Sequence, residues 1–65
     1  MITAKGKQIQ WYEGITIKDV LKIIDFDFPY IYVTLDGKIV QSRHWDTTRV
    51  PDGSKMDVHA IVAGG

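Results

Sequence analysis

Only one stretch of this chain has the periodicity of a helix, and it lies between two sets of alternating, strand-like segments. Its apolar side chains recur at helical spacing, at Ile17, Val20, Leu21 and Ile24. Thr16 can cap the free amides of the first turn, and Asp19, three residues later, completes a capping box. The helix should end near residues 25–27, because Phe28 precedes Pro29 and is biased towards an extended conformation. One helix among several strands predicts an α+β fold.

The other apolar residues alternate with polar ones, as in strands with one buried face. The expected strands are residues 2–5, 8–12, 30–35, 38–40 and 55–62. Gly6-Lys7 separates the first two expected strands, and Asp36-Gly37 separates the next two, so each predicts a hairpin. Asp36-Gly37 is the stronger signal, because both of its residues accept a positive φ. Trp45 is expected to pin the intervening loop, residues 41–54, as a satellite of the core. The predicted order is ββαββ followed by a terminal β, in a mixed sheet with one main helix on one face. The first and last strands can pair in parallel at its centre.

The chain ends in Gly64-Gly65, directly after the apolar run of the last expected strand. Glycine lacks a Cβ, so such an end can enter a narrow channel and present a bare carboxylate to another protein's chemistry. A chance Gly-Gly at two given positions has a probability of about 0.5% at ordinary glycine usage. We therefore expect residues 63–65 to be a flexible, functional tail rather than a frayed end.

Size and charge narrow the function further. A chain of 65 residues makes one domain, residues 1–65, with a small core and no room for a deep pocket. This argues against an autonomous enzyme and for a module that meets larger partners. Eight basic and eight acidic residues form no basic stripe, so no nucleic-acid partner is expected. The sequence has neither a signal peptide nor an apolar span that could cross a membrane, which favours a cytoplasmic location.

The chain has no cysteine, which excludes a disulfide framework, thiolate catalysis and a thiolate zinc site. If it handles sulfur, the simple carrier atom left is the terminal carboxyl carbon. His44 and His59 have no cluster of carboxylates at ligand spacing, so no metal site is predicted. The aspartates fit caps and turns, and a small domain cannot enclose a paired-carboxylate active site.

In length, order and ending, the whole chain resembles the ThiS family of ubiquitin-like β-grasp sulfur carriers. The resemblance rests on residues 2–7, 16–21, 33–40, 45–48, 52–53 and 62–65. Lys5 and Asp36 stand where the family usually has Asn, and Gln41 stands where Pro is frequent. These differences lie in turns and a loop, away from the tail.

The resemblance implies a carrier mechanism. A ThiF-type activating enzyme would adenylate the Gly65 carboxylate with ATP and magnesium. Sulfur from cysteine, delivered through a cysteine desulfurase, would displace AMP and leave a thiocarboxylate. Thiazole synthase would then take that sulfur to build the thiazole ring of thiamine. The chain would be a cosubstrate rather than an enzyme, would bind no cofactor itself, and would act as a monomer that docks transiently.

Site residues are expected at the tail and beside it. Gly65 would carry the sulfur, and Gly64, Ala63 and Val62 would thread into the partner. The docking candidates are Ile61, His59, Tyr30 and Tyr32. Simpler roles also fit: Val62 as the edge of the core, Ile61 as a covered residue and the tyrosines as solvated strand positions.

Three other functions fit the same pattern. A carrier of this class can deliver sulfur to molybdopterin, to cysteine synthesis or to tRNA thiolation, although the short Val62-Ala63 approach to the diglycine favours ThiS. A ubiquitin-like modifier would be joined to lysines through Gly65. A plain β-grasp interaction module would do no covalent chemistry at all.

Overall fold

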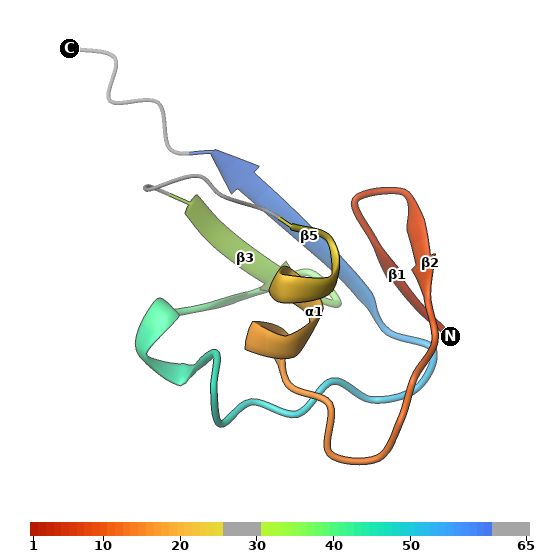
Figure 1. The fold of residues 1–65 in the computed structure, drawn as a ribbon. Helices are drawn as coiled ribbons and strands as arrows, with labels where there is room; N and C mark the ends of the chain where they lie inside the picture. The colour runs from red at the N-terminus through yellow and green to blue at the C-terminus, as the bar shows by residue number, and fades with distance from the viewer. Residues whose placement is uncertain (26–30, 61–65) are drawn as a thin grey trace, which may run out of the picture.

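The computed structural model of the chain describes residues 1–25 and 31–60, and these form a five-stranded sheet with one α-helix on one face (Figure 1). The elements are β1 (Ile2–Ala4), β2 (Lys7–Ile9), α1 (Ile17–Ile23), β3 (Ile31–Leu35), β4 (Lys38–Val40), the 3-10 helix η1 (Ser42–His44) and β5 (Lys55–Ala60). The strand order is β2-β1-β5-β3-β4. Only β1 and β5 pair in parallel within this sheet. The predicted α+β class, the element order and the parallel central pair are confirmed.

The first hairpin has shorter strands than the sequence predicts. Lys5 and Gly6 both have positive φ, 49° and 75°, and reverse the chain between β1 and β2. The prediction that the second strand continues to residue 12 is wrong, because β2 ends at Ile9. The indole Nε1 of Trp11 instead donates a hydrogen bond to the Val50 carbonyl at 2.8 Å, which ties this segment to a distant loop.

Helix α1 begins as predicted. The Thr16 amide donates to Asp19 Oδ2 at 3.1 Å, and the Asp19 amide donates to Thr16 Oγ1 at 3.3 Å, so the capping box is complete. These bonds from the Thr16 backbone and side chain lower the pKa of Asp19 from its ordinary value of 3.8. The helix ends with Ile24 as its C-cap, and Asp25 follows with φ 52°.

The second hairpin follows the Asp36-Gly37 signal. Both residues have positive φ, 50° and 85°, as a two-residue turn between twisted strands requires. The turn pairs Val33 with Val40 and Thr34 with Ile39. Because directly paired residues point to the same face, Val33 and Val40 face the helix, while Thr34 and Ile39 lie on the opposite face of the sheet.

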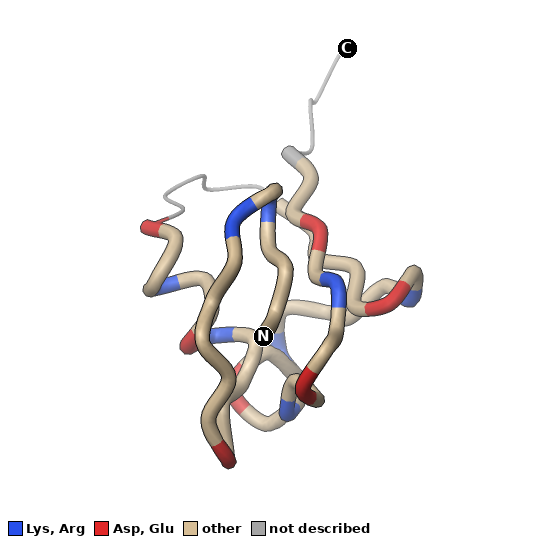
Figure 2. Tube along the Cα trace, turned by 90° about the vertical axis from the view of Figure 1, so that its right-hand side faces the viewer, with Lys and Arg blue, Asp and Glu red and all other residues tan. Residues whose placement is uncertain are grey.

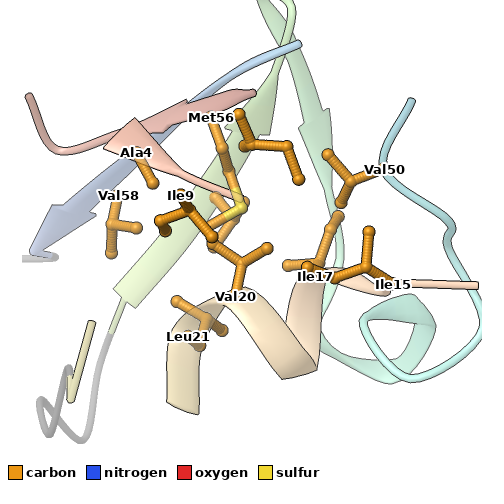
Figure 3. Close-up of a cluster of buried hydrophobic side chains, with 11 residues drawn as sticks. Ala4, Ile9, Ile15, Ile17, Val20, Leu21, Val50, Met56 and Val58 are labelled. Atoms are coloured by element: carbon orange, nitrogen blue, oxygen red, sulfur yellow. The ribbon is translucent and has the colours of Figure 1, made fainter. Parts of the chain in front are cut away.

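The core lies between the sheet and α1 (Figure 3). Ala4, Met56 and Val58 of the sheet point towards Val20 and Leu21 of the helix. Full burial of a Val, Leu or Met side chain contributes about 1.5–3 kcal/mol to the free energy of folding. These contacts therefore hold the helix in place on the sheet.

Two core residues come from loops and were not predicted. Ile15 and Val50 are both buried, and the Val50 amide donates to the Ile15 carbonyl at 2.9 Å. An isolated antiparallel bridge between Thr16 and Arg49 extends this contact. The loop over residues 41–54 is therefore fastened to the start of α1.

Trp45 has the role predicted for it. It is partly buried against the core, and its indole Nε1 donates to the Val40 carbonyl at 2.9 Å. This bond ties the C-terminal side of η1 back to the end of β4.

Charged residues of both signs are interspersed along the described trace, without a block of either sign (Figure 2). Within the described part of the chain, no helix has the length and apolarity needed to cross a membrane.

Candidate functional site

The site predicted from the sequence is the C-terminal tail together with the surface beside it. Six of its residues, Tyr30, Ile61, Val62, Ala63, Gly64 and Gly65, lie outside the residues that the structure describes. His59 and Tyr32 lie within them. The site can therefore be built up to the end of β5, from which the tail continues along the chain.

Strand β5 is a central strand of the sheet. β1 pairs with its beginning, at Lys55 and Met56, and β3 pairs with it as far as Ala60, which lies opposite Ile31. The last described residue before the tail is therefore paired within the sheet. A ladder of this length gives the tail a fixed point of departure.

Tyr32 of β3 and His59 of β5 come together on the face of the sheet opposite the helix. They are direct cross-strand partners, and their rings stack with centroids 4.7 Å apart and planes 15° from parallel. Their chain neighbours Val33 and Val58 point into the core, so alternation turns the two rings outward. Both side chains are exposed, Tyr32 by 38%. The structure thus brings together the two predicted docking residues that it describes.

Ile39 of β4 is a surface residue that the sequence analysis missed. Its side chain is 68% exposed, on the same face of the sheet as Tyr32. The signal was present in the sequence: a two-residue turn at Asp36-Gly37 places Ile39 opposite Thr34, outside the core. The outward face of β3, β4 and β5 therefore carries an isoleucine, a tyrosine and a histidine next to the strand that leads into the tail.

The residues of this surface are of types that occur in protein interfaces. Among the described residues, no group of three or more His, Asp and Glu side chains could hold a metal ion. The aromatic pair and Ile39 instead offer apolar area with polar edges, as protein interfaces do.

Solved structures with the same fold define the class of this protein. A crystal structure of the thiamine biosynthesis protein ThiS from Geobacter metallireducens superposes with a TM-score of 0.81 at 22% identity, over 98% of this chain and 97% of that one. A solution NMR structure of a thiamine biosynthesis protein from Geobacter metallireducens gives a TM-score of 0.72 at 22% identity, over 98% of this chain and 86% of that one. The protein is a ubiquitin-like β-grasp domain.

The family model of the ThiS family matches residues 1–65. The chain belongs to the ThiS family of sulfur carriers, which confirms the resemblance found in the sequence.

Proposed function

We propose that this protein carries sulfur on its C-terminal carboxylate and delivers it for thiazole formation in thiamine biosynthesis. The observation that carries the proposal is the ThiS family match over residues 1–65, a range that includes Gly64 and Gly65. The fold supports it, since the tail leaves from a central strand that is paired up to Ala60.

The chemistry requires activation of the terminal carboxylate, which is a poor acyl electrophile at neutral pH. A ThiF-type enzyme supplies ATP and magnesium, and a Gly65 carboxylate oxygen attacks the α-phosphorus with release of pyrophosphate. The outer sulfur of a persulfide, which the desulfurase forms from cysteine, then attacks the acyl carbon, and AMP leaves with the carboxylate oxygen. The thiol of a further cysteine molecule reduces the S–S bond of the resulting acyl disulfide and releases the thiocarboxylate. The product has one sulfur in place of one oxygen, and transfer of that sulfur by thiazole synthase restores the carboxylate.

The protein's own part in this reaction is presentation. Each residue that the partner's channel orders costs about 1–2 kcal/mol of backbone entropy, which contacts in the channel must offset. Residues of β5 up to Ala60 are ordered by the sheet and add nothing to that cost. The exposed surface formed by Tyr32, His59 and Ile39 lies beside this point and provides contact area for docking.

The test is reconstitution followed by intact mass measurement. The protein is incubated with ATP, magnesium, a ThiF-type enzyme, a cysteine desulfurase and cysteine. We expect a mass gain of sulfur minus oxygen, located at Gly65. Because the chain has no cysteine, a thiol-alkylating reagent should label the product and not the starting protein. Adding thiazole synthase and its other substrates should return the original mass.

The outcomes separate the alternatives. A stable adduct to lysines of target proteins would indicate a modifier, and no change with competent enzymes would indicate a plain interaction module. A thiocarboxylate that thiazole synthase does not accept would point to another sulfur acceptor. A chain lacking Gly65 is the matched control and should gain no sulfur.

A further inference from the structure

A surface hollow of about 380 Å³ lies beside β3, where β4 ends and η1 begins. The lining residues that matter for its chemistry are Ile31, Tyr32, Ile39, Val40, Arg43 and Trp45. Ile31, Val40 and Trp45 also pack against the core, whereas Ile39 is not part of it.

The hollow is mostly apolar and carries one charge. The indole N–H of Trp45 donates a hydrogen bond to the Val40 carbonyl, so the apolar ring remains as the contribution of Trp45 to the hollow. Ile39 contributes the most exposed large hydrophobic side chain among the described residues. Arg43 is the one charged residue among the described residues of the lining, and it has no ion-pair partner within residues 1–25 and 31–60. An apolar hollow with a guanidinium at its edge that has no ion-pair partner among the described residues is complementary to an apolar side chain accompanied by a carboxylate.

The hollow is close to the start of the tail. Ile31 and Tyr32 line it, and the same two residues pair with Ala60 and His59 at the end of β5. β3 is the direct neighbour of β5, and neighbouring strands are about 4.8 Å apart, so the hollow begins one strand spacing from the strand that leads into the tail. A stable protein contact covers about 800 Å² on each partner, a patch roughly 30 Å across. A contact of that size centred on the end of β5 would reach the hollow.

We infer that this hollow is a docking site for the enzyme that activates the tail. A surface segment of that ThiF-type enzyme places an apolar side chain against Ile39 and Trp45 and a carboxylate against Arg43. The inference rests on the proposed function for the identity of the partner. It assigns Arg43 and Ile39 to recognition, with no part in the acyl chemistry.

The experiment measures binding of the intact protein to a ThiF-type enzyme without ATP, by calorimetry, for Arg43→Glu and Ile39→Thr. The matched controls are Lys22→Glu and Ile23→Thr, an exposed cation and an exposed isoleucine on α1, outside the hollow. We expect Kd to rise about tenfold or more for Arg43→Glu and about fivefold for Ile39→Thr, with changes below twofold for the controls. Arg43→Gln should also reduce the salt dependence of binding. Urea unfolding of every variant shows whether the fold is intact.

With catalytic amounts of enzyme, saturating ATP and the carrier as the varied substrate, Arg43→Glu should raise KM for the carrier and leave kcat unchanged, since Arg43 acts in docking alone. Unchanged Kd and KM in folded Arg43→Glu and Ile39→Thr would overturn the inference even if the wild-type tail acquires sulfur. A wild-type dimer dissolved by Ile39→Thr in sedimentation would overturn it too, because the hollow would then bind a second copy. Failure of the wild-type tail to acquire sulfur counts against the proposed function, while the binding measurement still decides on the hollow.

Discussion

The rings of Tyr32 and His59 stack across β3 and β5 with centroids 4.7 Å apart, on the face of the sheet that α1 leaves uncovered. The contact joins the strand that ends in the tail to its neighbour, one residue before the last described pair, Ile31 with Ala60. It therefore adds to the pairing of β5 with β3 and lies on the exposed face of the sheet.

The stack should contribute measurably to stability. In a double-mutant cycle with Tyr32→Ala and His59→Ala, we expect a coupling of about 0.5–1 kcal/mol in the free energy of unfolding, as for other aromatic pairs. Urea denaturation gives the four values. The control cycle pairs Tyr12→Ala with His59→Ala, because no contact between these two residues is recorded in the described structure. Coupling in the control as large as in the Tyr32 cycle would contradict a specific stack.

Two isoleucines on α1 offer a direct test of the core. Ile17 is fully buried, whereas Ile23 is 53% exposed on the same helix. We expect Ile17→Ala to lower the free energy of unfolding by about 2–5 kcal/mol and Ile23→Ala to change it by less than about 0.5 kcal/mol. Both replacements change helix propensity alike, so the difference reports burial. Equal losses would mean that the helix packs on the sheet through another face.

The capping box should make part of the stability depend on pH. The folded pKa of Asp19 is lowered by bonds from the Thr16 backbone and hydroxyl, so the carboxylate stabilises the folded state above its ordinary pKa of 3.8. That contribution is lost as the pH falls through 3.8 towards the lower folded value. The stability gap between wild type and Asp19→Asn, measured by urea unfolding from neutral to acid pH, should shrink over this range.

Thr16→Ala should cost about 1 kcal/mol, and Thr16→Ser much less, because serine keeps the capping hydroxyl. In the Thr16→Ala background the pH dependence due to Asp19 should be weaker without vanishing, since the residue 16 amide still donates to the carboxylate. A difference in unfolding free energy between wild type and Asp19→Asn that stays constant with pH would contradict the role assigned to the ionised Asp19 carboxylate in the capping box.

Position 37 should tolerate a D-amino acid but not an L-amino acid. Its φ of 85° strains L-residues, yet a Cβ built there meets no atom within 4 Å. We expect Gly37→Ala to destabilise the domain by about 1–2 kcal/mol through backbone strain. A synthetic chain with D-Ala at this position should be at least as stable as wild type in urea unfolding. Equal destabilisation by both enantiomers would indicate crowding instead.

The tail prediction concerns activity alone. A bulky residue added after Gly65 should abolish adenylation by the activating enzyme, because the carboxylate is displaced and the channel blocked. The urea midpoint should stay unchanged. Pyrophosphate release measures the first half-reaction. Activation of the extended chain at the wild-type rate would remove the basis for a carboxylate carrier.

Local features were predictable because neighbouring residues decide them. Thr16 and Asp19 set the start of α1 with their own side chains, and Asp36-Gly37 sets the hairpin register through its positive φ angles. The same turn implies that Ile39 points outward, although only its measured exposure drew attention to it. The diglycine is likewise a local signal, which pointed to the family that the whole-chain match confirms.

Contacts between distant residues were harder to foresee. Ile15 and Val50 have no periodic pattern around them, yet both are buried because their backbones meet across the loop. Trp11 looked like a strand residue, but its indole found the Val50 carbonyl, 39 positions away. Hydrophobicity alone does not say which of several apolar residues closes a gap between elements, since that depends on how those elements pack.

The sequence by itself determined the single helix, the two hairpins, the outward and inward faces of the strands and the family to which the chain belongs. These follow from periodicity, caps and turns, whose energetics act over a few residues. Only the tertiary structure decided that loop residues complete the core, that Tyr32 stacks on His59, and that a hollow opens beside them. Arg43 lines this hollow and has no ion-pair partner among the described residues. These features form when segments far apart in the chain are brought together, and no local preference encodes the distances between them.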